Sequence, residues 1–159
     1  MRASAHPNAL RVAAALGPNF TVVEFDESTH TAQEAADAIG CSLAQIAKSI
    51  LFRSASGKPV MVIASGVNRV DEKKVRTLLG EKIERAGPDF VKETTGFEVG
   101  GVPPVAHASP CVIYLDEDLK PYPTVWAAGG TPNAVFEIGF AQLADVSGAT
   151  VADVKKPTP

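Results

Sequence analysis

Short apolar runs, bounded by glycine, proline and polar turns, cover the chain and predict a mixture of helices and strands. Runs rich in β-branched and aromatic residues are typical of strands. They predict strands at residues 20–25, 49–53, 59–65, 111–115, 125–128 and 134–138. Capping residues at the start of a segment and glycines at its end are typical of helices. They predict helices at residues 9–17, 31–40, 42–48, 71–80, 88–94 and 140–146.

The arrangement of these segments predicts one α/β (α+β) domain with a mixed, mostly antiparallel sheet and helices packed around it. Residues 59–65 are apolar on both faces, which favours a central strand. The turn at residues 56–58 favours an antiparallel hairpin. No repeat or linker divides the chain, so we expect a single domain over residues 1–159. Residues 152–159 lack a packing signal, and we expect a loose tail there.

Composition narrows the classes of function. Of the 159 residues, 45% are hydrophobic and 21% charged, which is an ordinary globular balance. No apolar run approaches the ~20 residues that cross a bilayer, so we expect no membrane partner. The net charge of −3 argues against a basic face for long nucleic acids, and any contact should cover a small area such as one end. Cys41 and Cys111 form no CxxC pair, which favours a reducing cytoplasm.

The loop Gly100-Gly101-Val102-Pro103-Pro104 is the first candidate for chemistry. Glycines let backbone amides approach a ligand, and prolines stiffen the chain where it turns away. Such a loop can hold an oxyanion or a water molecule. The alternative is a plain rigid turn between two elements.

Two further segments are candidates for the same pocket. Lys48 has apolar neighbours and is predicted at the end of a helix, where a phosphate, a carbonyl oxygen or a carboxylate would serve as its partner. Alternatively, it complements the helix dipole with its ammonium group in water. The loop at residues 129–133 again places glycines before a proline, although a hairpin loop explains its composition equally well.

Several kinds of catalytic site have no signature in the chain. The histidines at positions 6, 30 and 107 are scattered, and no HExxH motif or cysteine pair is present, so we expect no metal. No GxSxG elbow, GxGxxG motif or Walker motif is present, so we expect no cofactor. His107 follows the Gly100 loop and is either a base or a surface histidine.

From about residue 20 to residue 148 the chain resembles the YbaK/EbsC family, also known as prolyl-tRNA synthetase-associated or INS-like editing domains. The resemblance rests on an ordered set of motifs: Glu24-Phe25, Thr29-His30-Thr31-Ala32, Ala47-Lys48-Ser49, residues 67–74, the GxxxP loop at residues 100–104, Tyr114-Leu115-Asp116 and Ala128-Gly129-Gly130. Each motif is short, but their shared order is specific.

The resemblance implies a free-standing, cytoplasmic aminoacyl-tRNA deacylase without a cofactor. Such proteins remove a small wrong amino acid (alanine, cysteine or serine) from the 3′ end of tRNA, typically tRNA-Pro, by attack of a positioned water assisted by a ribose hydroxyl. The implied partners are tRNA and a prolyl-tRNA synthetase. Of the charged residues on the predicted helix 71–80, Lys73, Lys74 and Arg76 are candidates for contacting the acceptor stem, unless they form only a solvated face.

The family pattern also implies roles for individual residues. Lys48, Gly100 and Gly101 match catalytic positions, with the lysine orienting the substrate and the loop amides stabilising the oxyanion. The remaining matches are substrate-binding positions: His30, Pro104, Gly129, Gly130 and Asn133. Asn133 departs from the pattern, because relatives often carry a histidine there.

Two other functions stay open at the level of sequence. One is a non-catalytic module of the same fold that binds tRNA or a synthetase, which the departure at Asn133 motivates. The other is a hydrolase of small esters or thioesters, for which the sequence offers no positive signal.

Overall fold

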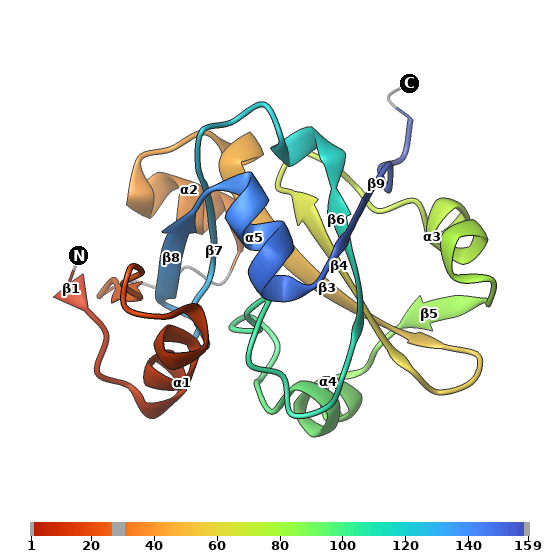
Figure 1. Cartoon of the computed structure of the whole chain (residues 1–159), viewed down its shortest axis with the longest axis horizontal. Coiled ribbons are helices and arrows are strands. Elements are labelled where there is room, and N and C mark those ends of the chain that lie inside the picture. The colour runs from red at the N-terminus through yellow and green to blue at the C-terminus, as the bar shows by residue number, and fades with distance from the viewer. Residues whose placement is uncertain (1, 27–30, 158–159) are drawn as a thin grey trace.

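The computed structural model describes residues 2–26 and 31–157, and within these ranges nine strands form a single twisted sheet (Figure 1). The order along the sheet is β1-β2-β8-β7-β3-β4-β6-β9, with β5 paired to β3 beside this path. The strand bounds are β1 Arg2–Ala3, β2 Val23–Glu24, β3 Ile46–Ser54, β4 Pro59–Ser65, β5 Ile83–Arg85, β6 Val112–Asp116, β7 Val125–Ala128, β8 Ala134–Ile138 and β9 Thr150–Ala152.

The sheet is mixed and mostly antiparallel, which confirms the predicted fold class. The centre is the antiparallel hairpin of β3 and β4, in which Lys48 lies opposite Ala64 and Phe52 opposite Val60. Three pairs are parallel: β3 with β7, β4 with β6, and β6 with β9. As predicted, β4 is central, and its side chains from Val60 to Ser65 are all buried.

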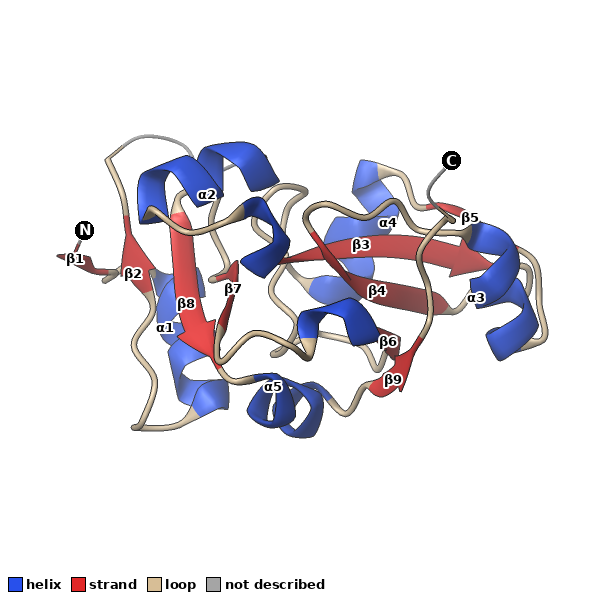
Figure 2. Cartoon of the chain, turned by 90° about the horizontal axis from the view of Figure 1, so that it is seen from above, coloured by secondary structure: helices blue, strands red, loops and turns tan. Residues whose placement is uncertain are grey.

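In the described part of the chain, five α-helices surround the sheet, and α2 and α5 cover opposite faces of it (Figure 2). Their bounds are α1 Pro7–Leu16, α2 Ala32–Ile39, α3 Glu72–Leu79, α4 Pro88–Thr95 and α5 Phe140–Ser147. The predicted caps are present: Thr31 and Glu34 form the capping box of α2, and Gly40 ends it in the left-handed conformation. The sequence therefore located all five helices to within a few residues.

The helix predicted at residues 42–48 is wrong. Only a 3₁₀ turn, η1 at Leu43–Gln45, follows the cap at Ser42, and β3 begins directly at Ile46. Ile46 and Ala47 are buried because β3 pairs with both β4 and β7, and these tertiary hydrogen bonds override a local helix signal. Lys48 consequently lies within a central strand and not at the end of a helix.

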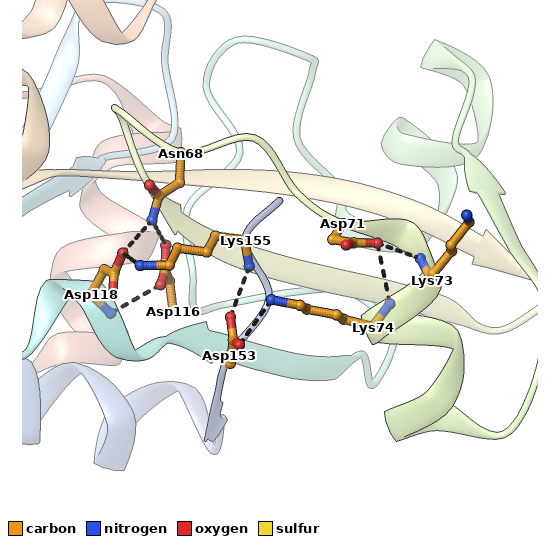
Figure 3. A network of polar contacts seen from close by, with 8 residues as sticks. All are labelled: Asn68, Asp71, Lys73, Lys74, Asp116, Asp118, Asp153 and Lys155. Atoms are coloured by element: carbon orange, nitrogen blue, oxygen red, sulfur yellow. Dashed lines mark hydrogen bonds and ion pairs between the residues drawn. The ribbon is translucent and has the colours of Figure 1, made fainter. Parts of the chain in front are cut away.

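The predicted loose tail is also wrong over residues 152–156. Strand β9 pairs with β6, and Val154 is fully buried. Lys155 pairs with Asp118 at 2.8 Å (Figure 3). The backbone N–H of Lys156 donates to the carbonyl of Arg69. The segment has one buried valine between charged residues. This gives no clear strand pattern in the sequence, because the pairing depends on the distant strand β6.

Candidate functional site

A cavity of about 190 Å³ opens where the beginning of β3 meets β7, β8, α2 and the loop after α4. Its floor and walls are largely apolar, and nine of its fifteen lining residues are alanines or valines, which come from the strands, from α2 and from the loop after α4. The lining residues are Thr31, Ala32, Ala35, Ile46, Ala47, Lys48, Ser49, Val99, Gly100, Val102, Trp126, Ala127, Ala128, Ala134 and Val135. The cavity therefore unites Lys48 with Gly100 and Val102 of the first glycine loop, whereas from the sequence this loop, the loop at residues 129–133 and Lys48 are only candidates for one pocket.

Among the described residues that line this cavity, Lys48 is the only one with a formally charged side chain. It is half-buried, and its Nζ donates a long hydrogen bond of 3.5 Å to the carbonyl of Gly66. Burial lowers the pKa of Lys48 below the usual range, the positive charge of Arg85 lowers it further, and Asp116 opposes the shift. A half-buried ammonium with a single weak protein acceptor has donors left for a ligand.

The turn that carries Gly66 is held by a buried carboxylate. Asp116 is fully buried, and its Oδ2 accepts hydrogen bonds from the Ser65 backbone at 3.0 Å and from Asn68 Nδ2 at 2.8 Å (Figure 3). Asn68 also donates to the carboxylate of Asp118, and Lys155 donates to the same carboxylate. This network fixes the turn and therefore the carbonyl group that orients Lys48.

In the Gly100–Pro104 loop, some backbone N–H groups are paired within the protein and others are not. Gly100 has a φ of +95°, a left-handed conformation that side chains disfavour. The Gly101 N–H donates to Glu98 at 3.1 Å, whereas among the described residues the N–H groups of Gly100 and Val102 have no acceptor in the protein. Both of these residues line the cavity, so its wall carries two backbone donors without a partner.

Gly101 and Pro104 do not line this cavity. A Cβ on Gly101 would lie 2.8 Å from the carbonyl carbon of Thr131, so this glycine allows the two glycine loops to pack against each other. Pro103 and Pro104 are buried behind the loop. These two prolines stiffen the loop that carries Gly100 and Val102.

His107 holds the far end of the same loop. Its Nε2 donates to the carbonyl of Pro103 at 2.7 Å, and burial lowers the pKa of its imidazole. It is absent from the cavity lining. Its role in the structure is therefore to hold the loop through the Pro103 carbonyl, and it is not placed to act as a base at the cavity.

The second glycine loop, at residues 129–133, supports the cavity from behind. Its flanking residues Ala128 and Ala134 line the cavity, whereas Gly129, Gly130 and Asn133 do not. Asn133 donates from Nδ2 to the Phe25 carbonyl at 2.6 Å and accepts from Thr131 at 3.0 Å, so both ends of its amide are occupied. His30 lies outside the described residues.

Sequence reasoning missed the residues that shape the cavity. Trp126 on β7 and Ala35 on α2 line it, and neither belongs to a motif. Ser49 also lines it, and its hydroxyl is buried without a hydrogen-bond partner. The pairing of β3 with β7, which places Ile46 opposite Trp126, brings these residues together. Such a long-range parallel pair leaves no local signal.

The described part of the chain contains no cluster of three or more His, Cys, Asp or Glu side chains placed to hold a metal ion. In the same residues no helix is long and apolar enough to cross a membrane. Burial raises the pKa of the Cys111 thiol to about 11, so this cysteine is an inert thiol at neutral pH.

Comparison with known proteins gives one consistent result. The model of the aminoacyl-tRNA editing domain family matches residues 26–146. The uncharacterized protein YwhH of Bacillus subtilis is 39% identical over 126 residues, which cover 79% of this chain and 80% of YwhH. A crystal structure of a candidate trans-editing enzyme for prolyl tRNA synthetase is 46% identical, with a TM-score of 0.91, and the match covers 97% of this chain and 100% of that chain.

Two other relatives have names that refer to tRNA. Proline–tRNA ligase of Bacillus licheniformis is 32% identical over 130 residues, which cover 80% of this chain but 22% of the ligase. The chain thus spans about a fifth of that enzyme's length. EbsC of Enterococcus faecalis, a candidate Cys-tRNA(Pro)/Cys-tRNA(Cys) deacylase, is 23% identical over 132 residues, which cover 77% of this chain and 80% of EbsC.

Proposed function

Because the chain belongs to the aminoacyl-tRNA editing domain family, we propose that it is a trans-acting deacylase for mischarged tRNA. The observation that carries this proposal is the meeting of Lys48 with the unpaired N–H groups of Gly100 and Val102 in one cavity. A cation and two fixed backbone donors beside an apolar hollow are suited to hydrolysis of an ester whose acyl side chain is small.

The reaction needs no protein nucleophile. A water molecule adds to the ester carbonyl carbon, and the negative charge that develops on the carbonyl oxygen is stabilised by the N–H groups of Gly100 and Val102. Lys48 orients the aminoacyl end through its free donors. The tetrahedral intermediate then collapses, the bond to the ribose oxygen breaks, and that oxygen takes a proton. A neighbouring ribose hydroxyl of the substrate assists the proton transfer, because the described residues that line the cavity include no histidine or carboxylate.

The size of the cavity is compatible with a small amino acid. Its volume of about 190 Å³ is roughly six times the ~30 Å³ that a water molecule occupies in the liquid. This leaves room for an amino acid with few non-hydrogen atoms, such as alanine, cysteine or serine. A synthetase pocket discriminates between such side chains by only ~1–3 kcal/mol, so their removal requires a second site.

The relatives favour tRNA-Pro as the carrier. One is a proline–tRNA ligase, and another is a structure described as a candidate trans-editing enzyme for prolyl tRNA synthetase. We therefore propose that this chain acts on tRNA-Pro, and that a prolyl-tRNA synthetase is a further partner.

A deacylation panel tests the function. One tRNA-Pro transcript is charged separately with alanine, cysteine, serine and proline, and the loss of each ester is followed under single-turnover conditions. We expect hydrolysis of at least one small wrong amino acid while proline is spared. Binding of the charged tRNA without hydrolysis of any of the four esters would contradict the proposal and favour a binding module.

Lys48→Met is the matched variant for this panel. It keeps the length of the side chain and removes the charge, and we expect a rate at least ~100-fold lower, as for loss of a transition-state contact. Because burial and Arg85 disfavour the charge in the folded state, the variant should be as stable as the wild type or more stable. Full activity of Lys48→Met would exclude the assigned role.

A further inference from the structure

The turn after β4, residues 66–69, carries or contacts several groups that act on Lys48. The Nζ of Lys48 donates to the Gly66 carbonyl at 3.5 Å, and the charges of Arg69 and Asp116 reach its ammonium group. Arg69 is part of this turn, and the Asp116 carboxylate is hydrogen-bonded to it. The conformation of the turn therefore affects the position and the charge of the lysine in the cavity.

The two halves of the turn are anchored in different ways. The Gly66 N–H donates to the carbonyl of Ile46, the first residue of β3, at 2.8 Å. The Gly66 carbonyl belongs to the next peptide unit, so its direction depends on the residues that follow. Asn68 fixes those residues, because its Nδ2 donates to Asp116 at 2.8 Å and to Asp118 at 2.9 Å.

A C-terminal segment, residues 153–156, binds the second half of the turn through its backbone, and we term this segment the strap. The Lys156 N–H donates to the Arg69 carbonyl at 2.8 Å, and the Asp71 N–H donates to the Val154 carbonyl at 2.7 Å. Val154 is fully buried, so the strap is packed against the core. The strap lies beyond residue 146, where the match to the editing-domain family model ends.

The strap also holds the turn through a charged side chain. The Nζ of Lys155 donates to Oδ2 of Asp118 at 2.8 Å, and the same oxygen accepts from Asn68 at 2.9 Å (Figure 3). The hydrogen bond from Lys155 lowers the pKa of the Asp118 carboxyl, which keeps this acceptor ionised. Without Lys155, the Asp118 carboxylate would turn toward water, and Asn68 would lose one of its two acceptors.

We propose that Lys155 is a positioning residue for Lys48, and that the strap orients the Lys48 ammonium group by holding the turn whose Gly66 carbonyl accepts from it. The proposal rests on the proposed function, to which it adds a residue that acts from outside the cavity, since Lys155 is absent from the cavity lining. A misplacement of about 1 Å in a catalytic group can lower a rate by about 100-fold, so a small movement of the turn is sufficient.

The alternative is that the strap stabilises the fold and has no effect on Lys48. The strap offers a matched comparison, because Lys74 pairs with Asp153 at 2.8 Å just as Lys155 pairs with Asp118 at 2.8 Å (Figure 3). The first pair ties the strap to α3, whereas the second ties it to the turn. Lys74→Met and Lys155→Met therefore remove similar ion pairs, and only the second change should reach Lys48.

The pKa of Lys48 reports on the turn without any substrate. Burial lowers this pKa most, the charges of Arg85 and Arg69 lower it further, and the charge of Asp116 opposes them. Release of the turn should expose the ammonium group and move Arg69 away, whereas the buried Asp116 stays in its place on β6. Greater exposure and the loss of a nearby positive charge both raise the pKa of Lys48 toward its ordinary value.

NMR of ¹³C-labelled lysine side chains measures this pKa, with the Lys48 signal assigned from its absence in Lys48→Met. We expect the pKa of Lys48 to rise in Lys155→Met and to stay unchanged in Lys74→Met. No rise in Lys155→Met would overturn the proposal. An equal rise in both variants would overturn it as well, because the strap would then act only through the stability of the fold.

The single-turnover rate on charged tRNA gives a second readout. Lys155→Met should lower the rate at saturating enzyme about threefold to fivefold, which is the effect that one partly exposed ion pair can transmit. Lys155→Arg keeps the ion pair and should restore the rate. Lys156→Met makes the same change of charge on an exposed neighbour and should leave the rate unchanged. A loss in Lys155→Met that Lys155→Arg does not restore would contradict the positioning role.

The failure of the proposed function would be visible separately. If the wild type hydrolyses none of the esters, the pKa of Lys48 still decides whether the strap positions this lysine. A rise confined to Lys155→Met would support the positioning role without catalysis, and a pKa equal to that of the wild type would overturn it.

Discussion

The loops at residues 100–104 and 129–133 both consist of two glycines followed by proline-containing turns, yet the fold uses them in different ways. In the first, Gly100 and Val102 line a cavity, and their backbone N–H groups have no acceptor among the described residues. The second lies behind that cavity, and its Gly130 is packed against the backbone of Asn8. Glycine in one loop leaves room for a ligand, and in the other it leaves room for the protein itself.

Each loop is also held by one side chain. His107 donates to the Pro103 carbonyl at 2.7 Å, and Asn133 donates to the Phe25 carbonyl at 2.6 Å. The first bond keeps a loop next to the cavity in shape, whereas the second links the loop before β8 to Phe25, the residue that follows β2. The comparison shows that unpaired N–H donors, and not the glycine and proline content, distinguish the candidate functional loop from the structural one.

The largest effect should come from Gly100→Ala. The φ of +95° is strained for alanine by ~1–2 kcal/mol, and relief of that strain would turn the N–H groups away from the cavity. We expect a loss of ~100- to 1,000-fold in the single-turnover rate, as for removal of an oxyanion donor. Gly17→Ala is the matched control, because Gly17 has a φ of +96° with no atom within 4 Å of the added Cβ. An active Gly100→Ala enzyme would remove the distinction between the loops.

Gly130→Ala should show the opposite pattern. Its φ is +102°, and the new Cβ would lie 2.9 Å from the Asn8 carbonyl oxygen, so strain and a clash with backbone combine. We expect the free energy of unfolding to fall by about 2–4 kcal/mol, with a nearly normal rate per folded molecule. Urea denaturation and the rate at low temperature measure the two quantities. Gly80→Ala supplies strain without a clash, since Gly80 has a φ of +84° and no neighbour within 4 Å.

The smallest effect concerns the pH dependence of the first loop. Burial lowers the pKa of His107, so the unfolded state binds its proton more readily than the folded state below about pH 6.5. The stability contributed by the neutral imidazole is therefore present above that pH and is lost as the pH falls through the lowered pKa. His107→Gln keeps a donor for Pro103 without a titrating group.

Thermal unfolding of both proteins between pH 7 and pH 5 measures this effect. The wild type should lose more stability than His107→Gln over that range, and the rate at pH 7 should differ little between them. Identical pH profiles would show that the imidazole titrates normally and that burial of His107 has no energetic consequence.

Local patterns in the sequence were sufficient for most elements of the fold. The five helices depend on caps such as Thr31 and Gly40, and the strands of the central hairpin on runs of β-branched residues, so nearest neighbours in the chain decide them. The exception, residues 42–48, carries a capping signal at Ser42 that pairing with β4 and β7 overrides from residue 46 onward. The packed residues 152–156 likewise depend on a partner strand far away in sequence.

The sequence by itself determined the family and the fold class, because these depend on ordered motifs and on local propensity. The tertiary structure decided that Lys48 and Gly100 line one cavity. Only the tertiary structure decided that the N–H groups of Gly100 and Val102 stay unpaired, whereas the N–H of Gly101 donates to the Glu98 carbonyl. It also decided that the side-chain amide of Asn133 donates to the Phe25 carbonyl and that Arg85 lines a second hollow, which shares Ser49 and Gly100 with the cavity of Lys48. Whether a donor or a charge is free depends on every neighbour within hydrogen-bonding distance, and those neighbours come from distant parts of the chain.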